Sequence, residues 1–180
     1  MTWGEDVHCE LIDGIIYDMS PSPGWVHQSI SAKLVKQLGN FLEGKPCVVF
    51  HAPFDVRLNV NEGDNTVVQP DVLVICDRSI ITKTGCTGAP DMVIEILSPS
   101  NARKDVILKR VKYQEAGVRE IWMLDPEDRI VQVFTQKKGQ YSYIDYINSE
   151  NIPLTALEGC SINMAQIFAE IDEFDASILP

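Results

Sequence analysis

The sequence predicts an α/β (α+β) fold in which a central mixed β-sheet is flanked by helices. Strand-like and helix-like segments follow one another in the order strand, helix, several strands, helix and strands again. Two short apolar runs, 72–76 and 92–97, have the character of buried strands. The chain has 180 residues, of which 45% are hydrophobic and 23% charged, so we expect a single domain covering residues 1–180.

The first half of the chain is expected to hold a hairpin, a helix and three strands. Asp13-Gly14 is a strong turn signal, so segment 10–19 should form two short strands around it. After a break at 20–24, a helix is expected over 25–42, closed by Gly44 and Pro46. Its apolar stripe has helical spacing and comprises Val26, Ile30, Leu34, Leu38 and Phe41. Strands are then expected at 47–50, 54–58 and 67–75, with a polar loop at 59–66.

The second half is expected to complete the sheet. A connection of mixed structure at 77–89 leads to a buried strand at 91–97, bounded by Pro90 and Pro99. A helix should follow after Asn101, continue to about Ala116 and stop at Gly117. The remaining expected elements are strands at 120–124, 130–135 and 140–146, an edge strand at 154–157 and a terminal helix at 162–171.

The distribution of charge narrows the possible functions. A net charge of −11 disfavours a protein that coats nucleic acid in general. Between 103 and 119, however, basic residues outnumber the two acids, Asp105 and Glu115; they are Arg103, Lys104, Lys109, Arg110, Lys112 and Arg119. Such a patch, helped by a bound metal, can hold a phosphodiester locally. It can equally be a solvated helix face.

The five cysteines are odd in number and widely spaced, and no Cys-x-x-Cys pair occurs. We expect them to be buried free thiols, as in a reducing compartment. The amino terminus has neither the basic start nor the apolar core of a signal peptide, and no apolar run is long enough to span a membrane. These features predict a cytoplasmic protein with no membrane partner.

Two acidic residues beside apolar strands are the main candidates for chemistry. Asp71 precedes a run of Val, Leu and Ile, and Glu95 stands in the middle of another. A carboxylate in such a place is costly to bury unless it is paired or binds a metal. Two carboxylates on neighbouring strands can share one hard cation, whose remaining ligands come from a substrate phosphate. Turn and solvent-facing positions are the alternatives for these two residues.

Two further groups are weaker candidates. Asp105, Lys109 and Tyr113 are spaced i, i+4 and i+8, which puts them on one side of the second helix. Such Asp–Lys pairs also occur as surface decoration. His27 stands near the start of the first helix, where a solvent-facing position is the alternative.

Taken in order, these motifs resemble the Uma-two family of endonuclease-like proteins, in the PD-(D/E)XK nuclease superfamily. The resemblance covers residues 10–135. It is carried by Glu10-Leu11-Ile12-Asp13-Gly14, Met19-Ser20-Pro21-Ser22-Pro23 with His27, Gln69-Pro70-Asp71, the segment 90–100, Asp105, Lys109, Tyr113, Gly117-Val118 and the segment 120–126.

The resemblance implies a restriction endonuclease-like core with a site for Mg²⁺ or Mn²⁺. Asp71 matches the aspartate of the PD element and Glu95 the acid of the (D/E)XK element, with Glu10 as an additional acidic ligand. The superfamily has a lysine two residues after the second acid, but this chain has Leu97 there. Lys109 is the best replacement and would orient the attacking water or stabilise negative charge. His27, Asp105 and Tyr113 would contact the substrate or support the ligands.

We therefore expect a Mg²⁺-dependent endonuclease that hydrolyses DNA phosphodiester bonds, with Asp71, Glu95, Glu10 and Lys109 as its catalytic residues. The alternative is a catalytically inactive nuclease-fold protein with a binding, regulatory or assembly role, which the −11 charge and Leu97 favour. A zinc or thiol enzyme is disfavoured because the histidines and cysteines lack metal-site spacing. A homodimer is expected for a small enzyme that cuts two-fold DNA, with the hairpin 130–146 as an interface.

Overall fold

The computed structural model describes residues 9–19, 23–59, 63, 65–98, 103–148 and 150–178, and their side chains except those of 103–105 and 178. The amino-terminal segment 1–8, part of the expected break at 20–24, the loop residue Asp64 and the segment 99–101 therefore lie outside the described residues.

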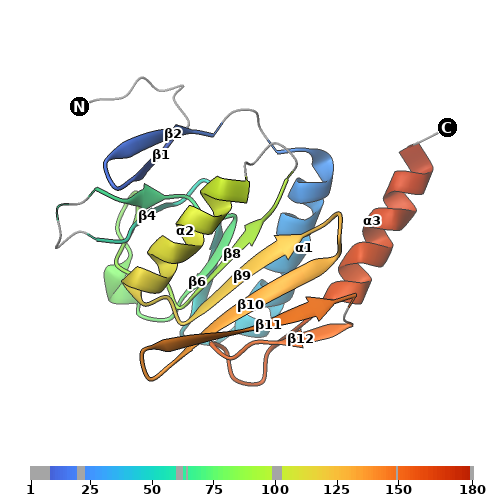
Figure 1. The fold of residues 1–180 in the computed structure, drawn as a ribbon. Coiled ribbons are helices and arrows are strands. Elements are labelled where there is room, and N and C mark those ends of the chain that lie inside the picture. The colour runs from blue at the N-terminus through green and yellow to red at the C-terminus, as the bar shows by residue number, and fades with distance from the viewer. Residues whose placement is uncertain are drawn as a thin grey trace.

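A six-stranded mixed sheet forms the centre of the fold (Figure 1), in the strand order β11-β10-β9-β8-β6-β3. Only β8 and β9 run parallel; the other neighbours are antiparallel. The strands are β3 (Val48–His51), β6 (Val72–Ile75), β8 (Met92–Ile96), β9 (Glu120–Asp125), β10 (Ile130–Lys137) and β11 (Gln140–Ile147). The predicted mixed sheet and α/β class are confirmed.

Helices cover both faces of this sheet, because alternate side chains of its strands enter two different cores. On one face, Val72 and Ile94 pack with α1 (Trp25–Leu42) and α3 (Met164–Ile178). On the other face, Leu73 and Val93 pack with α2 (Arg103–Ala116). The period of two in the strands thus separates α2 from α1 and α3, as Figure 1 shows. None of the described helices combines the length and the apolar composition that a membrane-spanning helix needs.

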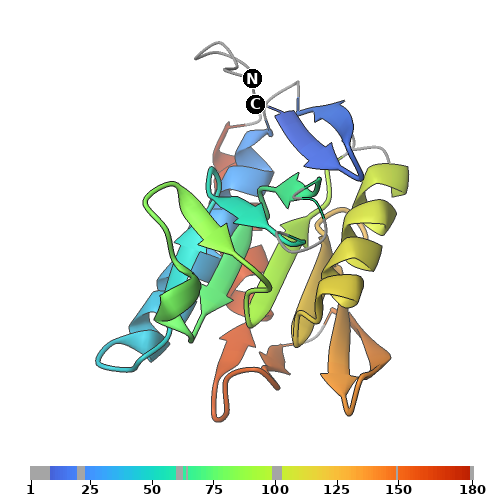
Figure 2. The ribbon, with the colours of Figure 1, turned by 90° about the vertical axis from the view of Figure 1, so that its left-hand side faces the viewer.

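A smaller five-stranded sheet lies on the α2 side, in the order β2-β1-β5-β4-β7. Its strands are β1 (Cys9–Ile12), β2 (Ile15–Asp18), β4 (Asp55–Arg57), β5 (Val67–Val68) and β7 (Gly85–Thr87). The predicted hairpin is confirmed: β1 pairs with β2, and both turn residues, Asp13 and Gly14, have positive φ. Lys112 of α2 lies 2.9 Å from the Asp13 carboxylate, which places the hairpin against α2 (Figure 2).

Three expectations for the elements are wrong. The expected strand 67–75 is two strands in different sheets, β5 and β6, because Pro70 between them lacks a backbone donor and interrupts the strand. Segment 154–157 is not a strand; the edge pair is β12 (Asn151–Pro153) with β13 (Ser161–Asn163). Residues 161–163 are therefore strand, and α3 begins only at Met164. The expected mixed connection at 77–89 contains a short 3₁₀ helix, η2 (Arg78–Ile80), and β7.

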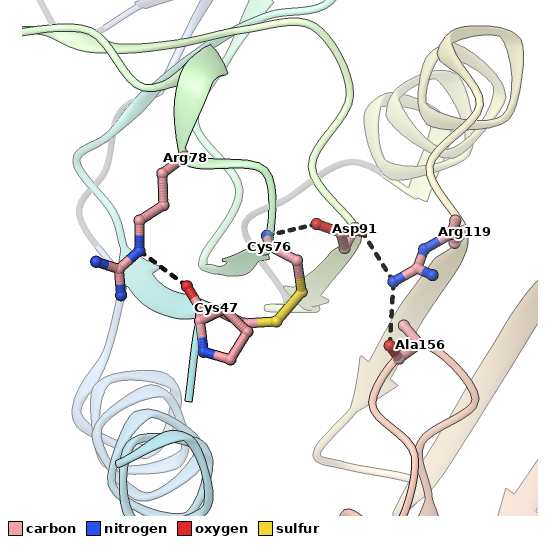
Figure 3. Close-up of a disulfide and its surroundings, with 7 residues drawn as sticks. Cys47, Cys76, Arg78, Asp91, Arg119 and Ala156 are labelled. Carbon is pink, nitrogen blue, oxygen red and sulfur yellow. Dashed lines mark hydrogen bonds and ion pairs between the residues drawn. A yellow bond between two sulfur atoms is a disulfide. The ribbon is translucent and has the colours of Figure 1, made fainter. Parts of the chain in front are cut away.

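The expectation that all five cysteines are free thiols is also wrong, since Cys47 and Cys76 form a disulfide (Figure 3). Strands β3 and β6 pair with Val48 opposite Ile75, so the residues that flank this pair face each other. Cys86 and Cys160 are buried thiols, and Cys9 is partly buried. The cysteines therefore give no support to a reducing compartment.

Candidate active site

The two strand acids lie side by side at one end of the central sheet. The register of β6 and β8 pairs Val72 with Ile94, so Asp71, one residue earlier, lies beside Glu95. The Asp71 carboxylate accepts a hydrogen bond of 2.7 Å from the backbone N–H of Ile96. Glu95 is 5% exposed although it stands in an otherwise apolar strand. Pro70 thus ends the ladder where the Asp71 side chain can reach across to β8.

Glu10 joins this site from the smaller sheet. It lies on β1 and is 7% exposed. Its carboxylate accepts a hydrogen bond of 2.7 Å from the backbone N–H of Gln69, two residues before Asp71. The segment 69–71 therefore holds Glu10 through the backbone N–H of Gln69, and it supplies the second acid, Asp71, itself.

Lys109 enters the site from α2 and bridges two of the acids. Its ammonium nitrogen lies 2.8 Å from Glu10 Oε1 and 2.7 Å from Glu95 Oε1. Burial alone lowers the pKa of this ammonium, but the charges of Glu95 and Glu10 outweigh it and hold the pKa above its ordinary value. Lys109 is therefore a fixed positive charge inside the molecule.

One ammonium does not balance the acids around Glu95. Burial raises the pKa of Glu95 to about 7; the charge of Lys109 opposes this, while those of Asp71 and Glu10 add to it. Near neutral pH, Glu95 is therefore divided between its protonated and ionised forms. An additional cation beside the cluster favours the ionised form.

Tyr113 supports Glu95 from the next turn of α2. Its side chain is fully buried, and its hydroxyl donates a hydrogen bond of 2.5 Å to Glu95 Oε1. Burial and the neighbouring Glu95 charge raise the pKa of Tyr113 well above its ordinary value, so the phenol stays a donor. Lys109 and Tyr113, four residues apart on one side of α2, thus meet the same carboxylate oxygen.

His27 lies on the α1 side of Asp71. His27 is 5% exposed, and its Nε2 is 3.1 Å from Asp71 Oδ2. The two groups are close enough to form an ion pair but are not aligned as a hydrogen bond, and both ring nitrogens lack a hydrogen-bond partner among the described residues. The interpretation of His27 as a solvent-facing residue is excluded by its burial.

The basic residues of segment 103–119 whose side chains are described do not form one continuous surface patch. Besides Lys109, Lys112 pairs with Asp13 and Glu115, Arg119 pairs with Asp91, and Arg110 lies over the Phe134 ring. Arg103, Lys104 and Asp105 belong to α2, but their side chains lie outside those that the structure describes. The expected role of Asp105 therefore stays a prediction.

The donor chemistry of the site suits a hard divalent cation. Glu10, Asp71 and Glu95 offer only carboxylate oxygens, the ligands that Mg²⁺ and Mn²⁺ prefer. If all three are ionised, they exceed the charge of Lys109, and a divalent cation removes this excess. Within the described residues, no three His, Cys, Asp or Glu side chains are arranged to hold a metal ion as they stand. Lys109 lies between Glu10 and Glu95, so these acids would have to turn toward an ion to bind it.

The role of the backbone was not visible in the sequence. The N–H groups of Gln69 and Ile96 hold Glu10 and Asp71, and the Gln69 side chain also donates to Asp55 Oδ1 at 2.7 Å. Backbone donors carry no residue signature. Only the position of Gln69 directly before Pro70-Asp71 hinted at its place in the site.

Comparisons with known proteins identify the family and the fold of the chain. The family Uma2, described as "Putative restriction endonuclease", matches residues 2–165. A crystal structure described as a putative nuclease belonging to DUF820, from Anabaena variabilis, superposes with a TM-score of 0.74. The superposition covers 93% of each chain at 19% identity, and this likeness shows the fold.

A relative known from its sequence is the uncharacterized protein slr1290 of Synechocystis. It is 33% identical over 96 residues, which is 53% of this chain and 48% of that protein. The chain thus matches about half the length of this relative.

Proposed function

The chain belongs to the Uma2 family, and from this premise we propose that it is a metal-dependent endonuclease that hydrolyses DNA phosphodiester bonds. The observation that carries the proposal is the position of Lys109. Its ammonium reaches Glu10 and Glu95 from α2, although Leu97 stands where the superfamily has its lysine. A buried ammonium among three acids at a sheet end has the components of a phosphodiester-cleaving site.

In this proposal each side chain of the site has a separate role. Asp71, Glu95 and Glu10 would hold Mg²⁺ or Mn²⁺, which when bound lowers the pKa of water and offsets negative charge on phosphate. Lys109 would place its ammonium beside the phosphate oxygens, where charge grows in the transition state. Tyr113 keeps Glu95 oriented through its hydrogen bond.

A plasmid-nicking assay with Mg²⁺ or Mn²⁺ tests the proposal. Asp71→Ala and Glu95→Ala should each lose at least about a hundredfold in rate, as expected when a ligand of the metal is removed. Asp91→Ala is the matched control: Asp91 also precedes a strand of the central sheet and accepts a backbone hydrogen bond, from Cys76 at 2.6 Å. It lies at the disulfide end of the sheet (Figure 3) and should leave the rate unchanged once folding is verified. Wild-type nicking by both Asp71→Ala and Glu95→Ala would exclude the proposed site.

A second candidate is a nuclease-fold protein that binds but does not cleave. The absence of a preformed ligand group among the described residues favours it, as does the −11 charge. Titration calorimetry with Mg²⁺ separates the two. Heat of binding that Glu95→Ala removes supports the endonuclease. No binding, with an unchanged melting temperature, supports the second candidate.

Two further parts of the proposal concern assembly and location. We place the dimer contact at hairpin β10–β11, because Tyr143 and Ile144 are exposed on β11 at the edge of the sheet. Sedimentation of wild type and Ile144→Asp tests this: a dimer that the variant dissociates agrees with it, and a wild-type monomer contradicts it. Cytoplasmic residence stays a proposal, which cell fractionation with an antibody to the chain tests.

A further inference from the structure

A cavity of about 410 Å³ opens on the α1 side of the candidate active site. It lies between the start of α1, the end of β8, the β9–β10 turn and α3. His27 is one of its lining residues and also lies 3.1 Å from Asp71, so one side chain separates the cavity from the acids. The volume is in the range of pockets that hold small ligands.

The walls of the cavity suit a flat, uncharged ring. Trp25 and Phe168 both line it. The Trp25 ring is half-buried and makes an edge-on contact with Phe174, at 5.1 Å between ring centroids. Phe168 is 7% exposed, and the Arg129 guanidinium lies 5.2 Å from its ring. Trp25 is therefore the aromatic side chain of this cavity on which a nucleobase can stack.

The charges of the cavity exclude a phosphate and favour a hydrogen-bond donor. Arg129, the only arginine or lysine among the described residues that line the cavity, is paired with Asp172 at 2.5 Å. Asp175 and Glu127 also line the cavity, and within the described part of the chain their carboxylates form no ion pair. Carboxylates accept from exocyclic amino groups, and the cytosine N4 amino group is their usual partner among the bases.

A phosphodiester at the acids brings a nucleoside with it on each side, and the cavity is one of the places where such a base can go. We propose that the cavity between α1 and α3 binds an unpaired, amino-bearing nucleobase next to the scissile phosphate, so that the chain acts on single-stranded or locally unpaired DNA. This substrate class rests on the proposed endonuclease function. A base in the cavity cannot be paired with a complementary strand, because its hydrogen-bonding edge faces protein groups.

Free nucleosides test the cavity without phosphate, metal or cleavage. Deoxycytidine and thymidine are titrated into the full chain in EDTA, followed by ¹H–¹⁵N spectra with the Trp25 indole N–H as reporter. Both probes are pyrimidines of similar stacking surface, but only deoxycytidine has an amino group. We expect deoxycytidine to bind about fivefold or more tightly than thymidine and to shift the Trp25 signal.

Matched double variants distinguish a specific contact from general electrostatics. Asp175→Ala with Glu127→Ala should bring the two affinities to within about twofold of each other. Glu173→Ala with Asp128→Ala removes the same charge from the same helix and turn, but neither residue lines the cavity. This control should keep the preference for deoxycytidine. Equal binding of the two nucleosides by wild type, or no shift of the Trp25 signal, would overturn the proposal.

The outcome is independent of the proposed endonuclease function. Plasmid nicking without nucleoside binding would support the proposed metal site and contradict the proposed base pocket. Nucleoside binding without nicking keeps the pocket in a protein that only binds DNA. If both hold, a single-stranded oligonucleotide of deoxycytidine should be cut faster than the same strand in a duplex, and equal rates would contradict the substrate class.

Discussion

Replacing Lys109 by Met tests the charge balance of the site. Met keeps most of the length of the side chain but removes the ammonium that bridges Glu10 and Glu95. Removing one partner of a buried ion pair costs about 3–5 kcal/mol, because the other charge stays buried. We expect this loss in the free energy of unfolding at pH 8.

The loss should shrink at low pH. Without Lys109, the pKa of Glu95 rises above its value of about 7, because the ammonium lowers it in the wild type. Each further unit costs about 1.4 kcal/mol at high pH and nothing at pH 5, where Glu95 is protonated in both folded proteins. Addition of Mg²⁺ at pH 8 should stabilise Lys109→Met more than wild type, since the ion supplies the missing positive charge.

Urea unfolding at pH 5 and pH 8, with and without Mg²⁺, measures these differences. The control is Lys112→Met, three residues further along the same helix. Lys112 pairs with Asp13 and Glu115, whose side chains are 51% and 59% exposed, so its loss should cost less than about 1 kcal/mol. Equal destabilisation by the two variants, or a loss at Lys109 that does not change with pH, would refute the charge-balance reasoning.

Three other predictions concern pH, the missing lysine and the disulfide. In metal-free wild type, the raised pKa of Glu95 should cost about 3 kcal/mol as the pH rises from 4.5 through 7. Glu95→Gln should remove this slope in urea titrations, and a persisting slope would assign it elsewhere. Leu97→Lys, added to Lys109→Met, should restore at least about a tenth of the nicking rate; no recovery would mean that the lysine must come from α2. Cys47→Ser with Cys76→Ser should lower the free energy of unfolding by about 3 kcal/mol and leave nicking unchanged, because the bond closes 29 residues at the opposite end of β6. A loss of nicking in the folded double variant would show that the disulfide at one end of β6 affects the acids at its other end.

The sequence was sufficient to predict the elements whose signals are local. The Asp13-Gly14 turn needs positive φ at both residues, and the structure has it. The apolar stripe of α1 identified its core face, since Ile30, Leu34 and Leu38 are fully buried. Glu95 was conspicuous because a charge in the middle of an apolar strand needs a partner.

The failures share a different cause, which is pairing between distant segments. Nothing within 67–75 shows that Val68 pairs with β4 while Val72 pairs with β3 and β8. The disulfide depends in the same way on the register of β3 with β6, which cysteine spacing does not reveal. Ile162 continues the apolar pattern of the helix that follows, but residues 161–163 are held as a strand by pairing with β12.

In the candidate active site, some residues were predicted from local sequence patterns and others depend on pairing between distant segments. Helical spacing put Lys109 and Tyr113 on one side of α2, and the structure brings both to Glu95. The approach of Glu10 depends on the smaller sheet, whose strands come from four separate parts of the chain, so no local pattern predicts it. Glu10 was the one residue of this group that only the resemblance to a known family indicated in advance.

An anomalous difference map from crystals grown with Mn²⁺ at pH 8 tests the metal site most directly. We expect a peak between the carboxylates of Asp71 and Glu95, with Lys109 Nζ moved away from Glu95 Oε1, from which it lies 2.7 Å without metal. An ordered site with no peak, and with Lys109 still bridging Glu10 and Glu95, would contradict a metal-dependent nuclease.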